Sequence, residues 1–189
     1  LFPALYEFTQ FTSGNELVAD QLTAFRKAFA RIDLSYATSK NLTPYDVLKI
    51  ASMIEKETVA PNERKLVSAV IYNRLRNKMP LGIDATLRYG LNIPGTESLT
   101  KAAIRSDNPY NSRRFPGLPP TPVANPGLAS IKAAAHPAAV DYLYYVRNVQ
   151  ANDGSHWFYA SAAEFERGKA EYQRWLEKER REKKANEGN

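Results

Sequence analysis

The stretch TPYDVLKIASMIEKET, residues 43–58, is the best-specified element of the chain, and the rest of the fold is built around it. Thr43 predicts a helix N-cap, Pro44 suits the first helical position, and Asp46 adds an acid to the first turn. Apolar residues then recur at helical spacing. The stretch therefore predicts an amphipathic helix with one face in the core.

Glu55 lies inside that apolar face when the helix is drawn at about 100° per residue. Burial raises a carboxyl pKa, which suits a proton donor, whereas the structural alternative is an ion pair with Arg64 or Arg74. Glu57, at the edge of the same face, and Glu63, in the first turn of the next helix, compete for the role. For both of them a supporting charge is the simpler interpretation.

The flanking segments predict helices and one long irregular region. A capping-box pattern at Ser13 and Glu16 begins a first helix with an apolar stripe. Pro61 begins a helix that forms a hairpin with the helix described above. Residues 80–127 are rich in Pro, Gly, Asn and Ser and contain one short helical window, residues 99–105. They predict a long loop region, and such regions usually carry function.

The elements after the loop region are short, and turn or capping residues mark where they begin and end. They are a helix over residues 129–135, strands over residues 142–149 and 156–159 joined through Asn152-Asp153-Gly154, and a last helix capped by Ser161 and Glu164. We therefore expect an α+β fold with a helical hairpin bearing the acid, a long Pro/Gly/Asn-rich loop region, a small β-hairpin and a C-terminal helix.

Composition excludes several classes of protein. The 189 residues contain no Cys and two His, so disulfides, thiolate nucleophiles and Cys-based zinc sites are excluded, and we expect neither a metal nor a cofactor. No stretch is apolar enough to span a membrane. The net charge of +6 permits an anionic partner, but the basic residues near the C-terminus alternate with Glu as on a solvated helix face. We do not expect nucleic-acid binding.

The loop region offers side chains that suit a sugar site. Aromatic rings provide apolar faces, and Asn, Ser and Thr provide directional hydrogen bonds; the candidates are Thr86, Tyr89, Asn108, Tyr110, Asn111, Ser112 and Phe115. Asp84 could pair with a Glu as in two-carboxylate glycosidases. His156, at the start of a strand, suits a site and a turn equally well.

The run Ile50–Thr58 resembles the signature of the YceG-like family of endolytic murein transglycosylases. Further motifs resemble that family in the same order: Glu63-Arg64, Val70-Ile71-Tyr72-Asn73-Arg74-Leu75, Asp84-Ala85-Thr86, Tyr89-Gly90, Asn108-Pro109-Tyr110-Asn111-Ser112, Gly117-Leu118-Pro119-Pro120, Asn125-Pro126-Gly127, Ala133-Ala134-Ala135-His136-Pro137 and Gly154-Ser155-His156-Trp157-Phe158. The resemblance covers nearly the whole chain.

The resemblance implies an activity and a set of site residues. The family cleaves the bond between N-acetylmuramic acid and N-acetylglucosamine within peptidoglycan strands and leaves a 1,6-anhydro end. By position, Glu55 matches the catalytic acid and base, with Glu57 and Glu63 as supporting charges. The substrate contacts expected from the matching motifs are Asn73, Asp84, Thr86, Tyr110, Asn111, Ser112 and His156.

The resemblance also implies an organisation and a location. We expect an N-terminal helical segment over residues 1–40, the YceG-like catalytic domain over residues 41–178 and a polar, frayed tail over residues 179–189. The chain begins at Leu1 without an initiator Met, so we expect a soluble piece of a plasma-membrane-anchored, outward-facing precursor. The partners implied are peptidoglycan strands and, beside them, cell-wall synthases.

Two rival interpretations remain open at the level of sequence. A muramidase would hydrolyse the same bond with a water molecule held by Asp84 or another carboxylate. A peptidoglycan-binding module without catalysis would need only the aromatic and Asn-rich loops. The masses of the released sugars separate the first rival from a transglycosylase, because an anhydro end lacks one water.

Overall fold

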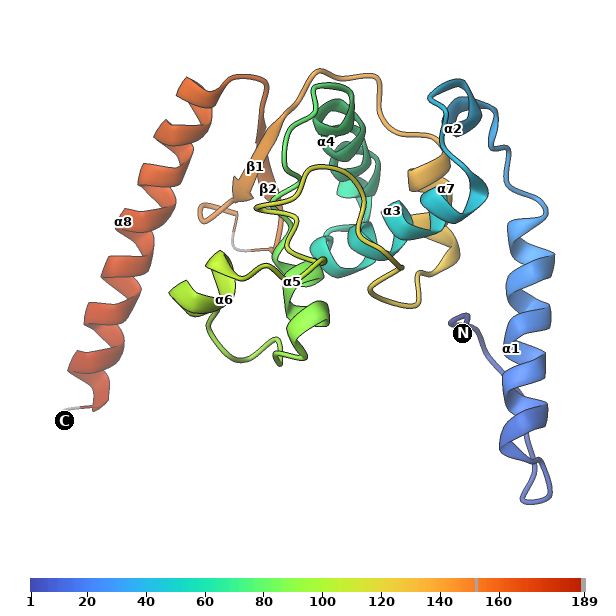
Figure 1. The fold of residues 1–189 in the computed structure, drawn as a ribbon. Helices are drawn as coiled ribbons and strands as arrows, with labels where there is room; N and C mark the ends of the chain where they lie inside the picture. Colours follow the sequence, from blue (N-terminus) through green and yellow to red (C-terminus); the bar gives the residue numbers. More distant parts are fainter. Residues whose placement is uncertain (152, 188–189) are drawn as a thin grey trace.

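The computed structural model describes residues 1–151 and 153–187. Its elements, in chain order, are α1 (Gly14–Phe29), α2 (Ser35–Ser39), α3 (Pro44–Glu57), the 3-10 turn η1 (Pro61–Glu63), α4 (Arg64–Arg76), α5 (Asp84–Leu91), α6 (Lys101–Arg105), α7 (Leu128–Ala135), β1 (Tyr144–Arg147), β2 (His156–Tyr159) and α8 (Ala162–Glu187) (Figure 1). The expected α+β fold, with helices and a small antiparallel sheet, is confirmed.

The core lies where α3, α4 and α7 meet in the middle of the molecule (Figure 1). The predicted start of α3 is confirmed, because Thr43 and Asp46 form a reciprocal capping box and Pro44 is the first helical residue. The fully buried side chains come mainly from these three helices and include Val47, Ile50, Met53, Ile54, Val67 and Ile131. These three helices therefore supply most of the apolar interior.

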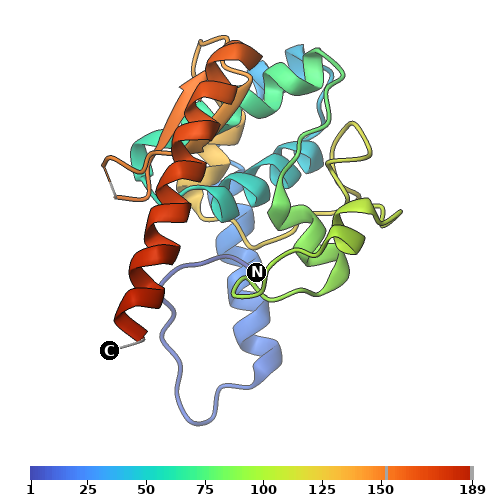
Figure 2. The same cartoon turned by 90° about the vertical axis from the view of Figure 1, so that its left-hand side faces the viewer.

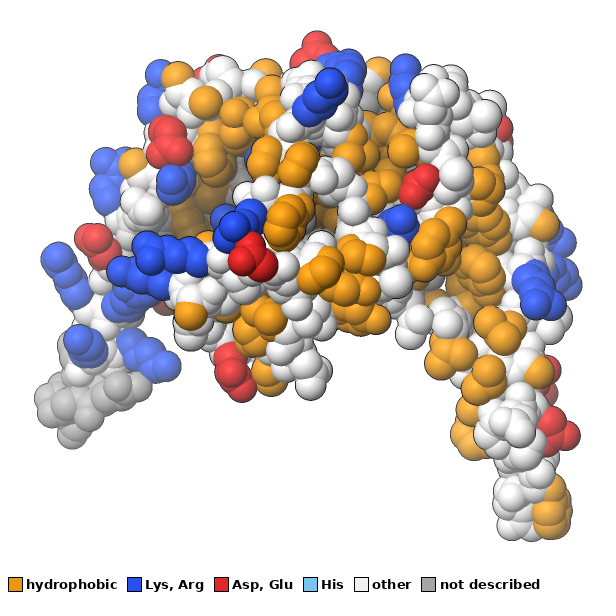
Figure 3. Space-filling view, viewed as in Figure 1, with side chains coloured by type: hydrophobic (Ala, Val, Ile, Leu, Met, Phe, Trp, Pro, Cys, Tyr) orange, Lys and Arg blue, Asp and Glu red, His pale blue; other side chains and the backbone are white. Residues whose placement is uncertain are grey.

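The first helix begins as predicted but packs less than its apolar stripe indicates. Ser13 and Glu16 form the capping box at its start. Phe25 and Phe29 pack near the core, whereas Val18 and Leu22 are 43% and 41% exposed. Figure 3 shows hydrophobic side chains along the side of α1 that faces the middle of the molecule. The short helix α2 that follows was not expected from the sequence.

The predicted β-hairpin is present, and α8 lies against it (Figure 2). Strands β1 and β2 are antiparallel, with Tyr145 opposite Phe158. Tyr144 stacks on Phe165 of α8, with ring centroids 5.0 Å apart. Asn152, which we expected in the connecting turn, lies outside the described residues. Helix α8 continues to Glu187, through much of the segment expected to fray.

The loop region contains a helix that the sequence analysis missed, since we expected only the window at residues 99–105. Helix α5 runs through Gly90, a poor helix former. A Cβ at Gly90 would lie 2.6 Å from the Cβ of Tyr110, and the Asn108 side-chain amide donates to the Gly90 carbonyl at 2.9 Å. The helix is therefore stabilised by the close packing of residues far along the chain, and local helix propensity does not predict such contacts.

Two kinds of feature are absent from the described residues. No helix in residues 1–151 and 153–187 has the length and hydropathy needed to cross a membrane. No cluster of three or more His, Asp or Glu side chains that could hold a metal ion occurs in the same part of the chain.

Candidate active site

Two carboxyl groups lie at the end of α3 and face different surroundings. Glu55 and Glu57 are two positions apart, and residues at that spacing do not share a helix face. Glu55 turns towards α7, whereas Glu57 turns towards α5 and the β-hairpin. The two groups therefore have different chemistry available to them.

The Glu55 carboxyl group joins α3 to the start of α7. Its Oε2 atom accepts hydrogen bonds from the backbone N–H of Gly127 at 3.0 Å and from the Ser130 hydroxyl at 2.6 Å. Gly127 is the N-cap residue of α7, so the carboxylate lies at the positive end of that helix. This geometry gives Glu55 a structural explanation that the sequence did not contain, in place of the Arg ion pair considered above.

The Glu57 side chain lines an open cavity of about 920 Å³ between α3 and α5. Other residues lining it are Lys56, Asp84, Arg88, Tyr89 and Tyr110. The rings of Tyr89 and Tyr110 lie 5.2 Å apart, and Tyr89 is half exposed. Carboxyl, aromatic and cationic groups thus meet in a space of the size that ligand sites have.

Burial raises the pKa of the Glu57 carboxyl, because the charged form loses water. A hydrogen bond from the Tyr145 hydroxyl, at 2.8 Å, opposes that shift. The charge of Asp84 raises the pKa further, and His156 and Arg113 lower it. A carboxyl group with a raised pKa at the wall of a cavity suits a general acid.

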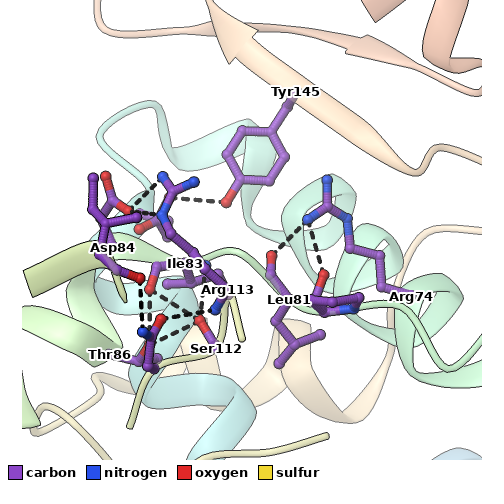
Figure 4. A network of polar contacts seen from close by, with 12 residues as sticks. Arg74, Leu81, Ile83, Asp84, Thr86, Ser112, Arg113 and Tyr145 are labelled. Carbon is purple, nitrogen blue, oxygen red and sulfur yellow. Dashed lines mark hydrogen bonds and ion pairs between the residues drawn. The ribbon is translucent and has the colours of Figure 1, made fainter. Parts of the chain in front are cut away.

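Asp84, at the start of α5, also lines the cavity but is held in an ion pair. Its Oδ1 atom lies 2.7 Å from Nε and 2.6 Å from Nη2 of Arg113, and both side chains are partly exposed. Figure 4 shows this pair beside Tyr145, which reaches towards it from the hairpin. Oδ1 of Asp84 is therefore already engaged by two N–H groups of Arg113, as in a structural ion pair.

Four of the expected substrate contacts lie inside the protein. The Ser112 hydroxyl accepts from the Ile83 N–H at 3.0 Å and from the Thr86 hydroxyl at 2.9 Å (Figure 4). The Asn111 amide donates to the carbonyls of Ile104 and Ser106, and its oxygen accepts from the Arg113 N–H. Asn73, in α4, donates to two carbonyls that precede β1, those of Val140 and Tyr142. All four are buried, and none lines the cavity.

His156, the first residue of β2, and Glu63, the last residue of η1, form a pair of their own. The His156 N–H donates to Oε1 of Glu63 at 2.7 Å, and its Nδ1 lies 2.8 Å from Oε2. Glu63 is 5% exposed, and neither residue lines the cavity. The structure thus brings Glu57, Asp84, Tyr89 and Tyr110 to one cavity, whereas Glu55, Glu63, Asn73, Thr86, Asn111, Ser112 and His156 do not line it.

The cavity also contains residues that the sequence analysis did not assign to the site. Arg88 of α5 donates to the Pro94 carbonyl at 2.7 Å, and Lys56 lies beside Glu57 on α3. Tyr145 lies outside the cavity lining but donates to Glu57, and the sequence predicts only that it belongs to a strand. Successive strand residues point to opposite faces of a sheet, but this rule does not say which ring meets a carboxyl group.

Comparison with known proteins defines the class to which this fold and cavity belong. The YceG-like family model matches residues 1–171, and the chain belongs to this family. A crystal structure of a putative YceG-like protein from Listeria monocytogenes superposes with a TM-score of 0.75 at 31% identity, covering 87% of this chain and 53% of that one.

Two curated relatives carry a more particular name. The endolytic murein transglycosylase of Streptococcus pneumoniae (strain R6) is 35% identical over 179 residues, which is 91% of this chain and 31% of the relative. That of Bacillus subtilis (strain 168) is 34% identical over 146 residues, which is 77% of this chain and 40% of the relative. The chain therefore spans only 31% and 40% of the length of these two relatives.

Proposed function

We propose that this chain is an endolytic murein transglycosylase that cuts peptidoglycan strands in the cavity beside Glu57. The observation that carries the proposal is the half-buried Glu57 carboxyl, with a raised pKa, at the wall of a cavity lined by Tyr89 and Tyr110. Aromatic rings bind the apolar faces of sugars, and a raised pKa suits a carboxyl group that donates a proton. The names of the two curated relatives support the same activity.

We also propose that Glu57, rather than the expected Glu55, is the catalytic acid and base. Oε2 of Glu55 already accepts from Gly127 and Ser130, and Glu55 does not line the cavity. Glu57 lines it and has the electrostatics of a proton donor. The assignment of Glu55 stays a prediction from the resemblance, and the geometry favours its neighbour.

One carboxyl group suffices for the proposed reaction. Glu57 gives its proton to the glycosidic oxygen of the leaving N-acetylglucosamine as the bond from that oxygen to C1 of N-acetylmuramic acid breaks. The 6-hydroxyl of the same muramic acid then attacks C1 and returns its proton to Glu57. A C1–O6 bond replaces the broken bond, the acid is restored, and no water is consumed.

Location and partners follow from the substrate proposed. Peptidoglycan lies outside the cytoplasmic membrane, so the cavity would work on the extracytoplasmic side. Anchoring by a segment beyond this chain, and work beside cell-wall synthases, belong to the same proposal.

The test is digestion of purified peptidoglycan followed by mass spectrometry of the released fragments. The proposal predicts fragments with 1,6-anhydro ends, each lighter by one water than the hydrolysis product. Reducing ends alone would favour a muramidase, and binding without cutting would favour the non-catalytic module. Glu57→Gln should bind strands and lose activity by roughly 10²–10⁴-fold.

A further inference from the structure

The two oxygens of the Glu57 carboxyl group have different surroundings. Oε2 accepts a hydrogen bond from the Tyr145 hydroxyl at 2.8 Å. Within the described part of the chain no hydrogen bond ends on Oε1. A neutral carboxyl group has one oxygen that carries the proton and one that accepts, so a donor at Oε2 favours the proton on Oε1.

Tyr145 is held in place from several directions. Its ring meets the His156 ring edge-on, with centroids 5.2 Å apart, and lies 5.8 Å from that of Phe158. His156 is fixed in turn by Glu63, and Arg74 donates to the Leu143 carbonyl just before the strand. Figure 4 shows Tyr145 extending from the hairpin towards the Asp84–Arg113 pair, on the opposite side from Arg74. The hydroxyl is thus a fixed point beside the acid.

We propose that Tyr145 is the positioning residue of the acid: its hydroxyl holds Oε2 of Glu57, so that Oε1 delivers and recovers the proton. The inference rests on the proposed function and adds to it a residue that neither the sequence motifs nor the cavity lining point to. Tyr145 does not line the cavity, so its effect passes through Glu57. The buried Glu63–His156 pair then serves to hold the Tyr145 ring, rather than to bind sugar.

The hydroxyl also bears on the charge that Glu57 carries during the reaction. Burial and the neighbouring Glu57 raise the pKa of Tyr145 well above its ordinary value, so it remains a donor at every working pH. A hydrogen bond to a carboxylate is stronger than one to the neutral acid. Tyr145 therefore stabilises the carboxylate formed after the first proton transfer, and its loss raises the pKa of Glu57.

The experiment compares Tyr145→Phe with Tyr144→Phe as the matched control. Both changes remove one phenolic hydroxyl from the same strand, and Tyr144 packs against Phe165 on α8 instead of Glu57. We expect kcat of Tyr145→Phe to fall roughly tenfold, because the lost bond ends on a charged group. KM should be kept, and the alkaline limb of the pH profile should move to higher pH. Tyr144→Phe should match the unmodified chain.

A second variant strengthens the same bond without removing it. Fluorinated tyrosine at position 145 keeps the ring and has a more acidic hydroxyl, so the alkaline limb should move to lower pH. Unchanged kcat and pH profiles in Tyr145→Phe, with normal melting temperature, would overturn the role of Tyr145. Glu57→Gln in the same assay separates the two proposals. An active Glu57→Gln variant would show that Glu57 is not the catalytic acid. An inactive one supports Glu57 as the acid, whatever the result for Tyr145→Phe.

Discussion

Replacing Glu55 should damage stability far more than catalysis. Two hydrogen bonds end on its Oε2 atom, from the Gly127 N–H at 3.0 Å and the Ser130 hydroxyl at 2.6 Å. Bonds to charged groups contribute about 1.5–3 kcal/mol each, and partial exposure favours the low end of that range. Glu55→Ala leaves both donors without this acceptor, so the free energy of unfolding should fall by about 2–4 kcal/mol.

The corresponding change in melting temperature is large enough to measure. For a domain of this size about 1 kcal/mol shifts the melting temperature by 2–4 °C, so Glu55→Ala should melt roughly 5–15 °C lower. Glu55→Gln keeps an acceptor oxygen and loses the charge beside the start of α7, so its loss should be about 1–2 kcal/mol. Glu97→Ala, an exposed Glu in the loop region, is the control and should stay within about 0.5 kcal/mol.

The assay is thermal unfolding followed by circular dichroism, with cutting of peptidoglycan measured well below the lowest melting point. Glu55→Gln should retain cutting within about tenfold, since the general acid is intact. The reasoning is refuted if Glu55→Ala melts like the unmodified chain. A folded Glu55→Gln variant that binds strands and does not cut them would return the catalytic role to Glu55.

Three further predictions concern Glu57 and the walls of the cavity. Folding raises the pKa of Glu57 above its ordinary 4.5, so the folded state binds more protons than the unfolded state. The free energy of unfolding should therefore fall as pH rises from about 4.5 through the raised pKa. Melting temperatures measured against pH should lose this slope in Glu57→Gln. Ser112→Ala should cost about 1–3 kcal/mol, because it leaves a buried backbone N–H without its acceptor, and should not raise KM as loss of a sugar contact would. Gly90→Ala should cost about 1–3 kcal/mol by pushing Tyr110 away, seen as a lower melting temperature and a higher KM, while Gly14→Ala, where an added Cβ meets nothing within 4 Å, should do neither.

The parts of the fold that are determined by interactions between residues close together in the sequence could be predicted. The capping boxes at Ser13 and Thr43 are local arrangements, and both form as their sequences indicate. The hairpin strands also follow from two neighbouring runs of aromatic and β-branched residues separated by a short polar connection. Helix α5 could not be predicted, because Gly90 disfavours a helix locally and the stabilising contacts come from Asn108 and Tyr110.

The sequence points to the end of α3 and to the loop region, but it does not rank the residues there. Helical periodicity says that Glu55 faces inward, but it does not say that the start of α7 meets it there. Similarly, Asn111, Ser112 and Thr86 suit sugars by their chemistry. In a long loop region, however, buried backbone groups need partners, and these three side chains supply them.

The most direct test of the account compares Glu57→Gln with Glu55→Gln on the same peptidoglycan. Both variants replace a carboxyl group by an amide at the end of α3, and the readout is the amount of anhydro-ended fragments released by equal amounts of folded protein. The account predicts that Glu57→Gln releases almost none and that Glu55→Gln releases them at a rate near that of the unmodified chain. Release by Glu57→Gln together with none by Glu55→Gln would contradict it.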